Sequence, residues 1–190
     1  PYPRWENLGL SIEPRNIKDV INDSDLNLDL KKIKISESPE ILIAGCGTGQ
    51  HAITTASKYK KSKILALDLS FKSLSYAKRK ADELKINNID FIQGDILDLE
   101  NIDRKFDIIE SVGVLHHMDN PFKGWKILNS CMNNDSLMLI GLYSEKARQH
   151  IKQIKNRIKK LKIQSNYKNI IQLRKDLIEN NDDHWNYIKS

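Results

Sequence analysis

Ile41-Leu42-Ile43-Ala44-Gly45-Cys46-Gly47-Thr48-Gly49-Gln50 is the segment around which this chain folds. Its first four residues form a continuous apolar run, which is typical of a strand buried on both faces. Three glycines follow at every second position, and glycine permits positive φ and the close approach of a ligand to the backbone. A helix is expected after Gly49, and the free N–H groups at a helix start attract polar ligands. The segment therefore predicts a nucleotide-type ligand at the carboxyl end of a parallel sheet. The alternative, that these glycines only let the strand and the helix pack closely, stays open.

The chain around this segment alternates between strand and helix patterns. Strands are expected at 41–44, 63–68, 89–93, 106–110 and 137–143, and helices from 50 to about 58, from 70 to about 85 and from about 122 to 132, with a turn at 133–135. Ser70 is a suitable N-cap for the second helix. One face of that helix is apolar and consists of Leu74, Ala77, Ala81 and Leu84. The alternation predicts right-handed βαβ units, and therefore an α/β fold with a doubly wound, mostly parallel sheet of five strands.

Three regions follow from this pattern: a lead-in at 1–38, a core at 39–145 and a helical extension at 146–190. The lead-in opens with Pro1-Tyr2-Pro3-Arg4-Trp5, which is expected to be extended and to cover an apolar surface with its aromatic rings. One short helix is expected in the rest of it. The extension predicts two helices, at 145–163 and at about 168–179, and shows no further strand.

Charge is distributed unevenly between these regions. The chain has a net charge of +6, and the stretch from Lys146 to Lys175 contains eleven Lys and Arg residues and no acidic residue. The rest of the chain therefore carries a net charge near −5. An acidic body with basic C-terminal helices is expected. The first of these helices also bears an apolar stripe, formed by Ile151, Ile154, Ile158 and Leu161.

Composition excludes several classes of protein. No apolar run approaches the roughly 20 residues that a membrane-spanning helix needs, and no signal-peptide pattern opens the sequence. The two cysteines, Cys46 and Cys131, belong to no CxxC or Cys/His cluster. This pattern predicts a reducing, cytoplasmic location and argues against a structural metal site.

Acidic residues stand where three of the predicted strands end. Asp68 ends the second strand, Asp95 follows the third and Glu110 ends the fourth. A carboxylate in the position of Asp68 can accept hydrogen bonds from both hydroxyls of a ribose, a contact that NAD-binding folds also use. A dinucleotide fingerprint would need glycine where this chain has Gln50. The spacing therefore argues against a dinucleotide.

In combination these motifs resemble the class I S-adenosylmethionine (SAM)-dependent methyltransferases, which have a Rossmann-like fold. The resemblance covers about residues 38–145 and is strongest to the groups known as methyltransferase type 11, type 12 and domain 25. It implies SAM as cofactor and transfer of its methyl group to an acceptor. It also implies a set of cofactor-binding residues: Gly45, Cys46, Gly47, Thr48, Gly49, Asp68, Leu69, Asp95, Ile96, Glu110 and Ser111.

The chain departs from the pattern of that family in three places. Members commonly carry an acidic residue where this chain has Ile43, so the contact with the methionine amino group has to come from elsewhere, with Glu110 as one candidate. The usual Pro-Gly-Gly turn is replaced by Asn133-Asn134-Asp135. The usual C-terminal β-hairpin is absent from the sequence. Because the sequence also begins without methionine, a piece of a longer protein is expected. Segments similar to Pro1–Trp5 occur in bacterial methyltransferases joined to tetratricopeptide repeats, so that protein is expected to be bacterial.

Two adjacent histidines, His116 and His117, follow the fourth strand in a segment similar to the "vLHH" motif of the family. Methyl transfer from a sulfonium is an in-line displacement, which needs a well-placed acceptor and the exclusion of water. A histidine can remove the proton of the acceptor near neutral pH, so both are candidate catalytic residues, with His116 slightly favoured. The alternative, that they only line the loop, stays open. Cys46 is expected to fill space in the turn rather than to act as a nucleophile.

The acceptor itself cannot be read from the sequence. A small molecule or a protein is expected, while the motifs of the DNA methyltransferases, an Asn/Asp-Pro-Pro-aromatic segment or a Pro-Cys nucleophile, are missing. The sequence does not decide the oligomeric state. A second function class remains open, namely a catalytically silent SAM- or nucleotide-binding module that acts through its basic helices. Aminopropyl transfer, which uses the same fold, fits less well because Glu110-Ser111 stands where those enzymes place an aspartate.

Overall fold

The computed structural model describes residues 4–24, 28–29, 36–180 and 186. The chain forms two compact units, Pro1–Leu142 and Tyr143–Ser190, and each is considered by itself. Of the segment predicted to be extended at the start of the chain, the first three residues lie outside the described residues. Arg4 and Trp5 are described, and neither belongs to a helix or a strand.

The first unit is built on a five-stranded sheet in which every pairing is parallel. The strands are β1 (Glu40–Ala44), β2 (Lys63–Asp68), β3 (Ile89–Gln93), β4 (Phe106–Val112) and β5 (Met132–Gly141), in the spatial order β3-β2-β1-β4-β5. From β1 the chain therefore adds β2 and β3 on one side, and then returns to add β4 and β5 on the other side of β1. This confirms the predicted doubly wound α/β fold. It places the switch point, where ligands bind in such sheets, between the carboxyl ends of β1 and β4.

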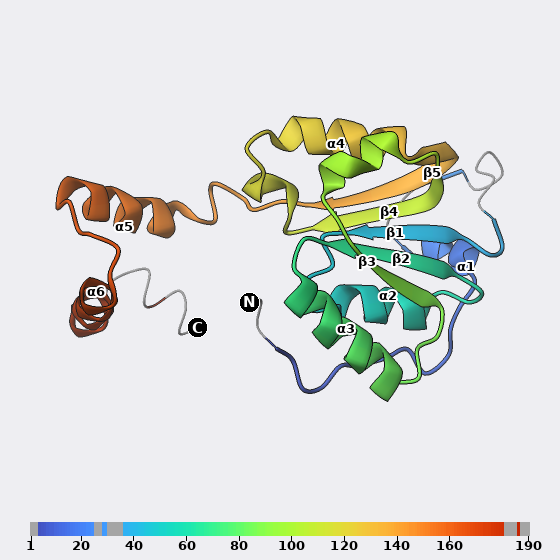
Figure 1. Ribbon diagram of the computed structural model, residues 1–190, viewed down its shortest axis with the longest axis horizontal. Coiled ribbons are helices and arrows are strands. Elements are labelled where there is room, and N and C mark those ends of the chain that lie inside the picture. Colours follow the sequence, from blue (N-terminus) through green and yellow to red (C-terminus); the bar gives the residue numbers. More distant parts are fainter. Residues whose placement is uncertain (1–3, 25–27, 30–35, 181–185, 187–190) are drawn as a thin grey trace. The chain divides into compact units, whose positions relative to one another are not determined.

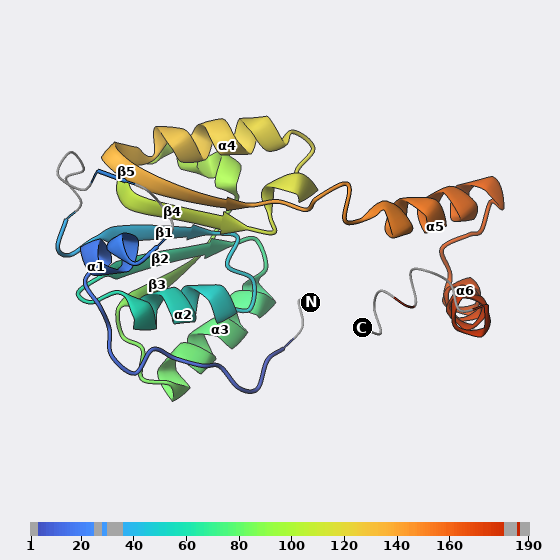
Figure 2. The same cartoon turned by 180° about the vertical axis from the view of Figure 1, so that it is seen from behind.

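Helices cover both faces of this sheet (Figure 1). One face carries α2 (Gln50–Lys58) and α3 (Phe71–Glu83), and the other carries α4 (Pro121–Ser130) and the 3₁₀ helix η1 (Ile96–Asn101). The short helix α1 (Ile17–Asn22) lies near the amino ends of the strands, away from the glycine turn (Figure 2). This short helix was expected in the lead-in.

The continuous apolar run of β1 follows from this two-sided cover. Ile41 and Ile43 belong to a core that also contains residues of α1, α2 and α3. Leu42 and Ala44 point the other way and belong to a second core with residues of η1 and α4. Alternate side chains of a strand face opposite sides of a sheet, so a strand covered on both sides needs an apolar residue at every position.

Local signals placed most boundaries correctly. The side chain of Ser70 accepts a hydrogen bond from the backbone N–H of Ser73 at 3.3 Å, so it caps α3 as predicted. Strand β4 runs two residues further than the predicted 106–110. Helix η1 was not predicted, because its six residues are too short for a periodic pattern.

The predicted start of the fifth strand is wrong. The sequence predicts a turn at 133–135 and a strand at 137–143, whereas β5 starts at Met132 and ends at Gly141. The pairing shifts register here, since Phe106 is opposite Met132 while Ile108 is opposite Leu137. Asp135, with φ +60, lies inside this irregularity. The polar residues that suggested a turn therefore form a bulge within a longer strand.

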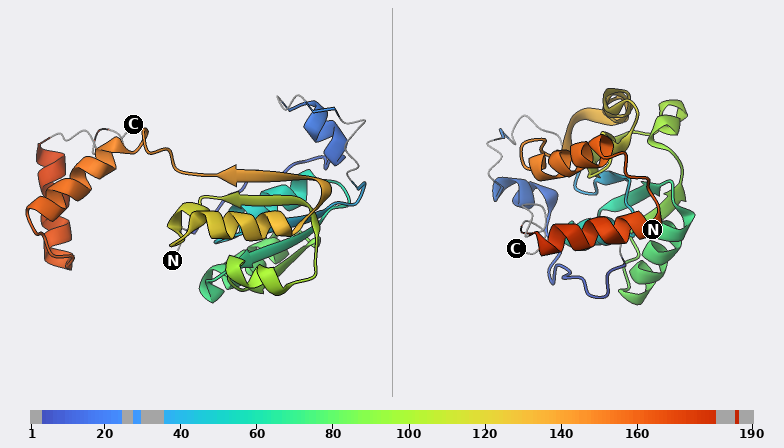
Figure 3. Two further views of the ribbon diagram at one scale, coloured as in Figure 1. Left: turned by 90° about the horizontal axis from the view of Figure 1, so that it is seen from above. Right: turned by 90° about the vertical axis from the view of Figure 1, so that its left-hand side faces the viewer.

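The second unit contains the helices α5 (Gln149–Lys160) and α6 (Tyr167–Glu179), joined by a short connection (Figure 3). Helix α5 is shorter at both ends than the predicted 145–163, while α6 matches its prediction within one residue. Asn166 caps α6 by accepting a hydrogen bond from the N–H of Asn169 at 2.9 Å. Among the residues described in this unit there is no strand. Nowhere in the described part of the chain is a helix both long and apolar enough to span a membrane.

Candidate functional site

The three glycines after β1 all have positive φ, but for different reasons. The φ values are +81 for Gly45, +55 for Gly47 and +84 for Gly49. A Cβ on Gly45 would lie 2.4 Å from a methyl of Val114, and a Cβ on Gly49 would lie 2.5 Å from the Cβ of Ala77. Close packing therefore explains the first and the third glycine, as the alternative interpretation held. Gly47 lines a cavity, as Gly45 also does.

Asp68, at the end of β2, joins the glycine turn to the start of α3. Its Oδ2 accepts a hydrogen bond from the N–H of Gly47 at 2.7 Å, and its Oδ1 accepts one from the N–H of Ser70 at 2.9 Å. A carboxylate has about four lone-pair sites, and these two bonds use one on each oxygen. The other site on each oxygen is available to a ligand. Two hydroxyls on neighbouring carbons, as in a ribose, match that arrangement.

Two cavities meet at this carboxylate. They have volumes of about 460 Å³ and about 490 Å³, and they share four lining residues, Gly45, Asp68, Val114 and His117. We call them the β3-side cavity, which also has Leu69, Asp95 and Ile96 in its wall, and the α2-side cavity, which also has Cys46, Thr48 and His51 in its wall. Together they form an elongated site along the carboxyl edge of the sheet, at the switch point.

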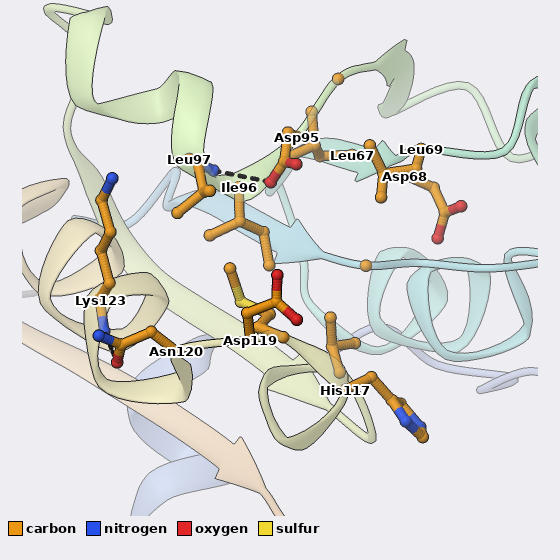
Figure 4. Close-up of a pocket in the computed structure, with 14 residues that line it drawn as sticks. Leu67, Asp68, Leu69, Asp95, Ile96, Leu97, His117, Asp119, Asn120 and Lys123 are labelled. Carbon is orange, nitrogen blue, oxygen red and sulfur yellow. Dashed lines mark hydrogen bonds between the residues drawn. The ribbon is translucent and has the colours of Figure 1, made fainter.

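The β3-side cavity contains the predicted residues that follow β2 and β3. Asp68 and Leu69 lie on one side of it with Asp95 and Ile96, and the loop after β4 supplies the opposite side (Figure 4). Asp95 also has a structural role, because its side chain accepts a hydrogen bond from the N–H of Leu97 at 2.9 Å in a capping box for η1. Its carboxylate is thereby held at the cavity wall.

The opposite side of the same cavity was not predicted. It consists of Met118, Asp119 and Asn120, which precede α4, and of Lys123 in the first turn of α4. Asn120 caps α4 by accepting a hydrogen bond from the N–H of Lys123 at 3.1 Å. The Asn-Pro pair at the start of that helix could have indicated the cap, but no sequence signal shows that the cap residue faces a cavity.

Glu110 and Ser111, the two residues predicted as ligands at the end of β4, line neither of these cavities. Ser111 is completely buried, and its hydroxyl donates a hydrogen bond to the carbonyl of Ala44 at 3.1 Å. Glu110 is buried against α2, where its Oε2 accepts a hydrogen bond from the hydroxyl of Thr55 at 2.9 Å and lies 2.8 Å from Nε2 of His51. His51 itself lines the α2-side cavity and was missed by sequence reasoning.

The two candidate catalytic histidines have different positions. His117 lines both cavities and is exposed, whereas His116 is half-buried and lines neither. Their Nε2 atoms lie 3.1 Å apart, so one ring can donate a hydrogen bond to the other. The structure therefore brings His117 to the junction of the cavities, and not His116, which the sequence slightly favoured for its place nearer the strand.

Cys46 faces the α2-side cavity from a buried position, and burial together with the charge of Asp68 raises the pKa of its thiol to about 12. A thiol with that pKa is not nucleophilic near neutral pH. We expect iodoacetamide at pH 8 to modify neither Cys46 nor the buried Cys131 in the folded protein, and to modify both in urea. Intact-mass spectrometry counts the adducts. Rapid labelling of Cys46 in the folded state would show that its thiol is reactive.

Trp5 of the lead-in holds the glycine turn in place. Its indole N–H donates a hydrogen bond to the carbonyl of Thr48 at 3.1 Å, and its ring meets that of Tyr76 edge to face at a centroid distance of 5.9 Å. The hydroxyl of Tyr76 donates to the carbonyl of Trp5. The expected covering role of the aromatic residues thus holds for Trp5, which is part of the core and lines neither of the two cavities.

Residues 4–24, 28–29, 36–180 and 186 contain no cluster of three or more His, Cys, Asp or Glu side chains that could hold a metal ion. The polar side-chain groups at the two cavities are instead three carboxylates, one ammonium group, hydroxyls, amides and two imidazoles. Such groups suit an organic ligand with hydroxyls and amines.

Comparison with known proteins gives the same family as the resemblance found in the sequence. A family described as "Methyltransferase domain" matches residues 35–187. An uncharacterized protein of Synechococcus sp. is 33% identical over 63% of this chain and 29% of its own length. A probable (S)-tetrahydroprotoberberine N-methyltransferase of Papaver bracteatum is 29% identical over 70% of this chain and 37% of its own length.

Among solved structures, PKMT2 from Rickettsia typhi in complex with AdoHcy, the demethylated form of SAM, matches with a TM-score of 0.58. The two are 26% identical, and the match covers 66% of this chain and 25% of that one. This chain thus spans between 25% and 37% of the length of these three proteins. The match to the family covers most of the chain, including α5 and α6. The chain therefore belongs to the methyltransferase domain family, with the fold of the class I SAM-dependent methyltransferases.

Proposed function

We propose that this chain binds SAM across the two cavities and transfers its methyl group to a small-molecule acceptor. The observation that carries the proposal is the Asp68 carboxylate, which stands where the cavities meet and keeps one lone-pair site on each oxygen for a ligand. With the ribose on Asp68, the adenine belongs in the β3-side cavity beside Asp95 and Ile96. The amino-acid end then belongs in the α2-side cavity.

When bound, SAM supplies an electrophilic methyl group on a sulfonium. The residues of this chain contribute binding and orientation, since holding two reactants in line can lower a barrier by about 7–11 kcal/mol. Val114 and His117 stand in the wall shared by both cavities, and we assign His117 as the residue that accepts the proton of the acceptor on a ring nitrogen. General-base help of this kind contributes about 10²–10⁴-fold.

The nature of the acceptor rests on the relatives. Two of them are named as N-methyltransferases of (S)-tetrahydroprotoberberine and (S)-coclaurine, both small molecules. An amine of a small molecule is therefore the proposed acceptor class. The proposed location is cytoplasmic, which two buried free thiols support. We also propose that the core at 39–145 and the extension at 146–190 work as one methyltransferase domain, since the family match runs through both.

Titration calorimetry tests the cofactor. SAM and S-adenosylhomocysteine (SAH) are expected to bind with one site per chain, and NAD is expected not to bind, because Gln50 replaces the third glycine of a dinucleotide fingerprint. The same protein sample serves for all three ligands, so a folding defect would abolish every signal. Binding of NAD without binding of SAM or SAH would refute the proposal.

A second function keeps the binding site but not the reaction, namely a silent module that acts through its basic helices. The observation in its favour is the stretch 146–175, which contains eleven Lys and Arg residues and no acidic residue of its own. Incubation with a cell extract and SAM labelled at the methyl group separates the two functions. Label transferred to an acceptor supports the enzyme, whereas SAM binding without transfer, in the full-length protein, supports the silent module.

A further inference from the structure

His51 lies between a buried carboxylate and the α2-side cavity. Its side chain is 43% exposed and lines that cavity, while its Nε2 lies 2.8 Å from Oε2 of Glu110, whose side chain is only 8% exposed. The same oxygen accepts a hydrogen bond from the hydroxyl of Thr55 at 2.9 Å. His51 and Thr55 are four residues apart on α2, so they share one face of that helix.

The position of Glu110 explains how the site accommodates Ile43. Ile43 on β1 lines the α2-side cavity and is the register partner of Glu110 on β4. Paired residues of neighbouring parallel strands face the same side of the sheet. The carboxylate missing at position 43 is thus present one strand away on the same face, but it lies behind His51 and is not itself in the cavity wall.

The pairing with Glu110 determines which ring nitrogen of His51 can bind a ligand as an acceptor. A carboxylate accepts hydrogen bonds and does not donate them, so Nε2 carries the proton that faces Glu110. In a neutral imidazole the other nitrogen is then an acceptor. Nδ1 of His51 is therefore the ring atom suited to receive an N–H from a ligand.

The α2-side cavity has few other acceptors of this kind. Among the described residues that line it, Asp68 is the one carboxylate, and its remaining lone-pair sites are assigned above to the ribose. The amino-acid end of SAM carries an ammonium group, which needs acceptors and favours a nearby negative charge. His51 backed by Glu110 provides both.

We infer that His51 binds the α-ammonium group of SAM through Nδ1, with Glu110 as the positioning residue that orients the ring. The inference rests on the proposed function, because it places the amino-acid end of SAM in the α2-side cavity. The His51–Glu110 pair differs in one chemical respect from an acidic residue on β1. A neutral ring receives the ammonium group, and the carboxylate acts from behind it.

The test compares SAH, which has the ammonium group, with 5′-methylthioadenosine, which lacks the whole amino-acid end. Wild-type protein is expected to bind SAH more tightly than 5′-methylthioadenosine. His51→Ala is expected to weaken SAH binding about 10-fold, the loss that one charge-assisted hydrogen bond accounts for, and to leave 5′-methylthioadenosine unchanged. Titration calorimetry measures both ligands with each protein.

Thr54→Ala is the matched control, because Thr54 is on the same helix and its hydroxyl donates to the carbonyl of Gln50 and lines neither cavity. It is expected to change neither affinity. Glu110→Gln keeps an oxygen that can accept from Thr55 and His51 while it removes the charge. In the His51→Ala background this second change is expected to cause no additional loss of SAH affinity, which a purely structural role of Glu110 would not predict.

The outcomes distinguish a failure of the inference about His51 from a failure of the proposed function. If His51→Ala leaves SAH affinity unchanged, or weakens both ligands equally, the inference is overturned while the proposed function stands. If the wild-type protein binds neither SAH nor 5′-methylthioadenosine, the proposed function itself fails. A selective loss for SAH, absent in Thr54→Ala, supports the inference.

Discussion

Replacing Asp68 with alanine is expected to lower the affinity for SAM and SAH by at least about 150-fold, equivalent to about 3 kcal/mol. The carboxylate keeps one lone-pair site on each oxygen after it binds the N–H groups of Gly47 and Ser70. Hydrogen bonds to a charged group contribute about 1.5–3 kcal/mol each, and two ribose hydroxyls would lose them together. Titration calorimetry with SAH measures the loss directly.

The same substitution also affects the protein without ligand, because the two backbone N–H groups lose their acceptor. Asp68→Asn separates the two effects: it keeps one acceptor oxygen but turns an amide donor toward Gly47 or Ser70. Both variants are to be compared at a temperature where circular dichroism shows them folded. Full SAH affinity in a folded Asp68→Ala protein would contradict the assignment of the ribose to this carboxylate.

Replacing Gly49 with alanine is expected to destabilise the fold by about 2–5 kcal/mol, a large part of the total stability of about 5–15 kcal/mol of a typical domain. Positive φ costs a residue with a Cβ about 1–2 kcal/mol. Overpacking adds about 1–3 kcal/mol, because the new Cβ would lie 2.5 Å from the Cβ of Ala77 and 3.1 Å from its Cα. Urea denaturation, followed by circular dichroism, gives the change in the free energy of unfolding.

Gly113→Ala is the matched control for the cost of positive φ in a residue with a Cβ. Gly113 has φ +77, close to the +84 of Gly49, but a Cβ added there would meet nothing within 4 Å. Its substitution should therefore cost only the conformational part, about 1–2 kcal/mol. Combining Gly49→Ala with Ala77→Gly should relieve the clash and give a non-additive double mutant. Equal losses for Gly49→Ala and Gly113→Ala would show that contact with α3 is unimportant.

The fold was predictable because its signals are local or periodic. The apolar run of β1 and the Ser70 cap depend on the immediate neighbours of each residue, so they can be read without knowing what packs where. The fifth strand shows the limit of this reasoning. Asn133, Asn134 and Asp135 are turn-forming residues, yet pairing with β4 retains them within β5 as a bulge. A long-range hydrogen-bonded ladder outweighs a local preference.

The candidate site likewise combines residues that local signals predicted with residues that only long-range contacts brought together. Asp68 and Asp95 were predicted from their places at the ends of strands, and both line the β3-side cavity. His51 was missed, because a single histidine at the start of a helix has no distinctive pattern. Glu110 and His51 are 59 positions apart in the sequence numbering, and the pairing of β4 with β1 is what brings them together. Which of two neighbouring histidines faces the cavities also depends on the 3₁₀ helix at Leu115–His117.

The sequence by itself determined the class of the fold, the glycine turn and the carboxylates at the ends of β2 and β3, because these features follow from residue type and spacing along the chain. Only the tertiary structure decided how the turn is held and what surrounds it. Trp5 bonds to Thr48, Val114 packs on Gly45, and His51 stands in front of Glu110. These contacts join distant segments, and their partners are selected by the packing of the whole sheet and its helices, which local preference does not encode.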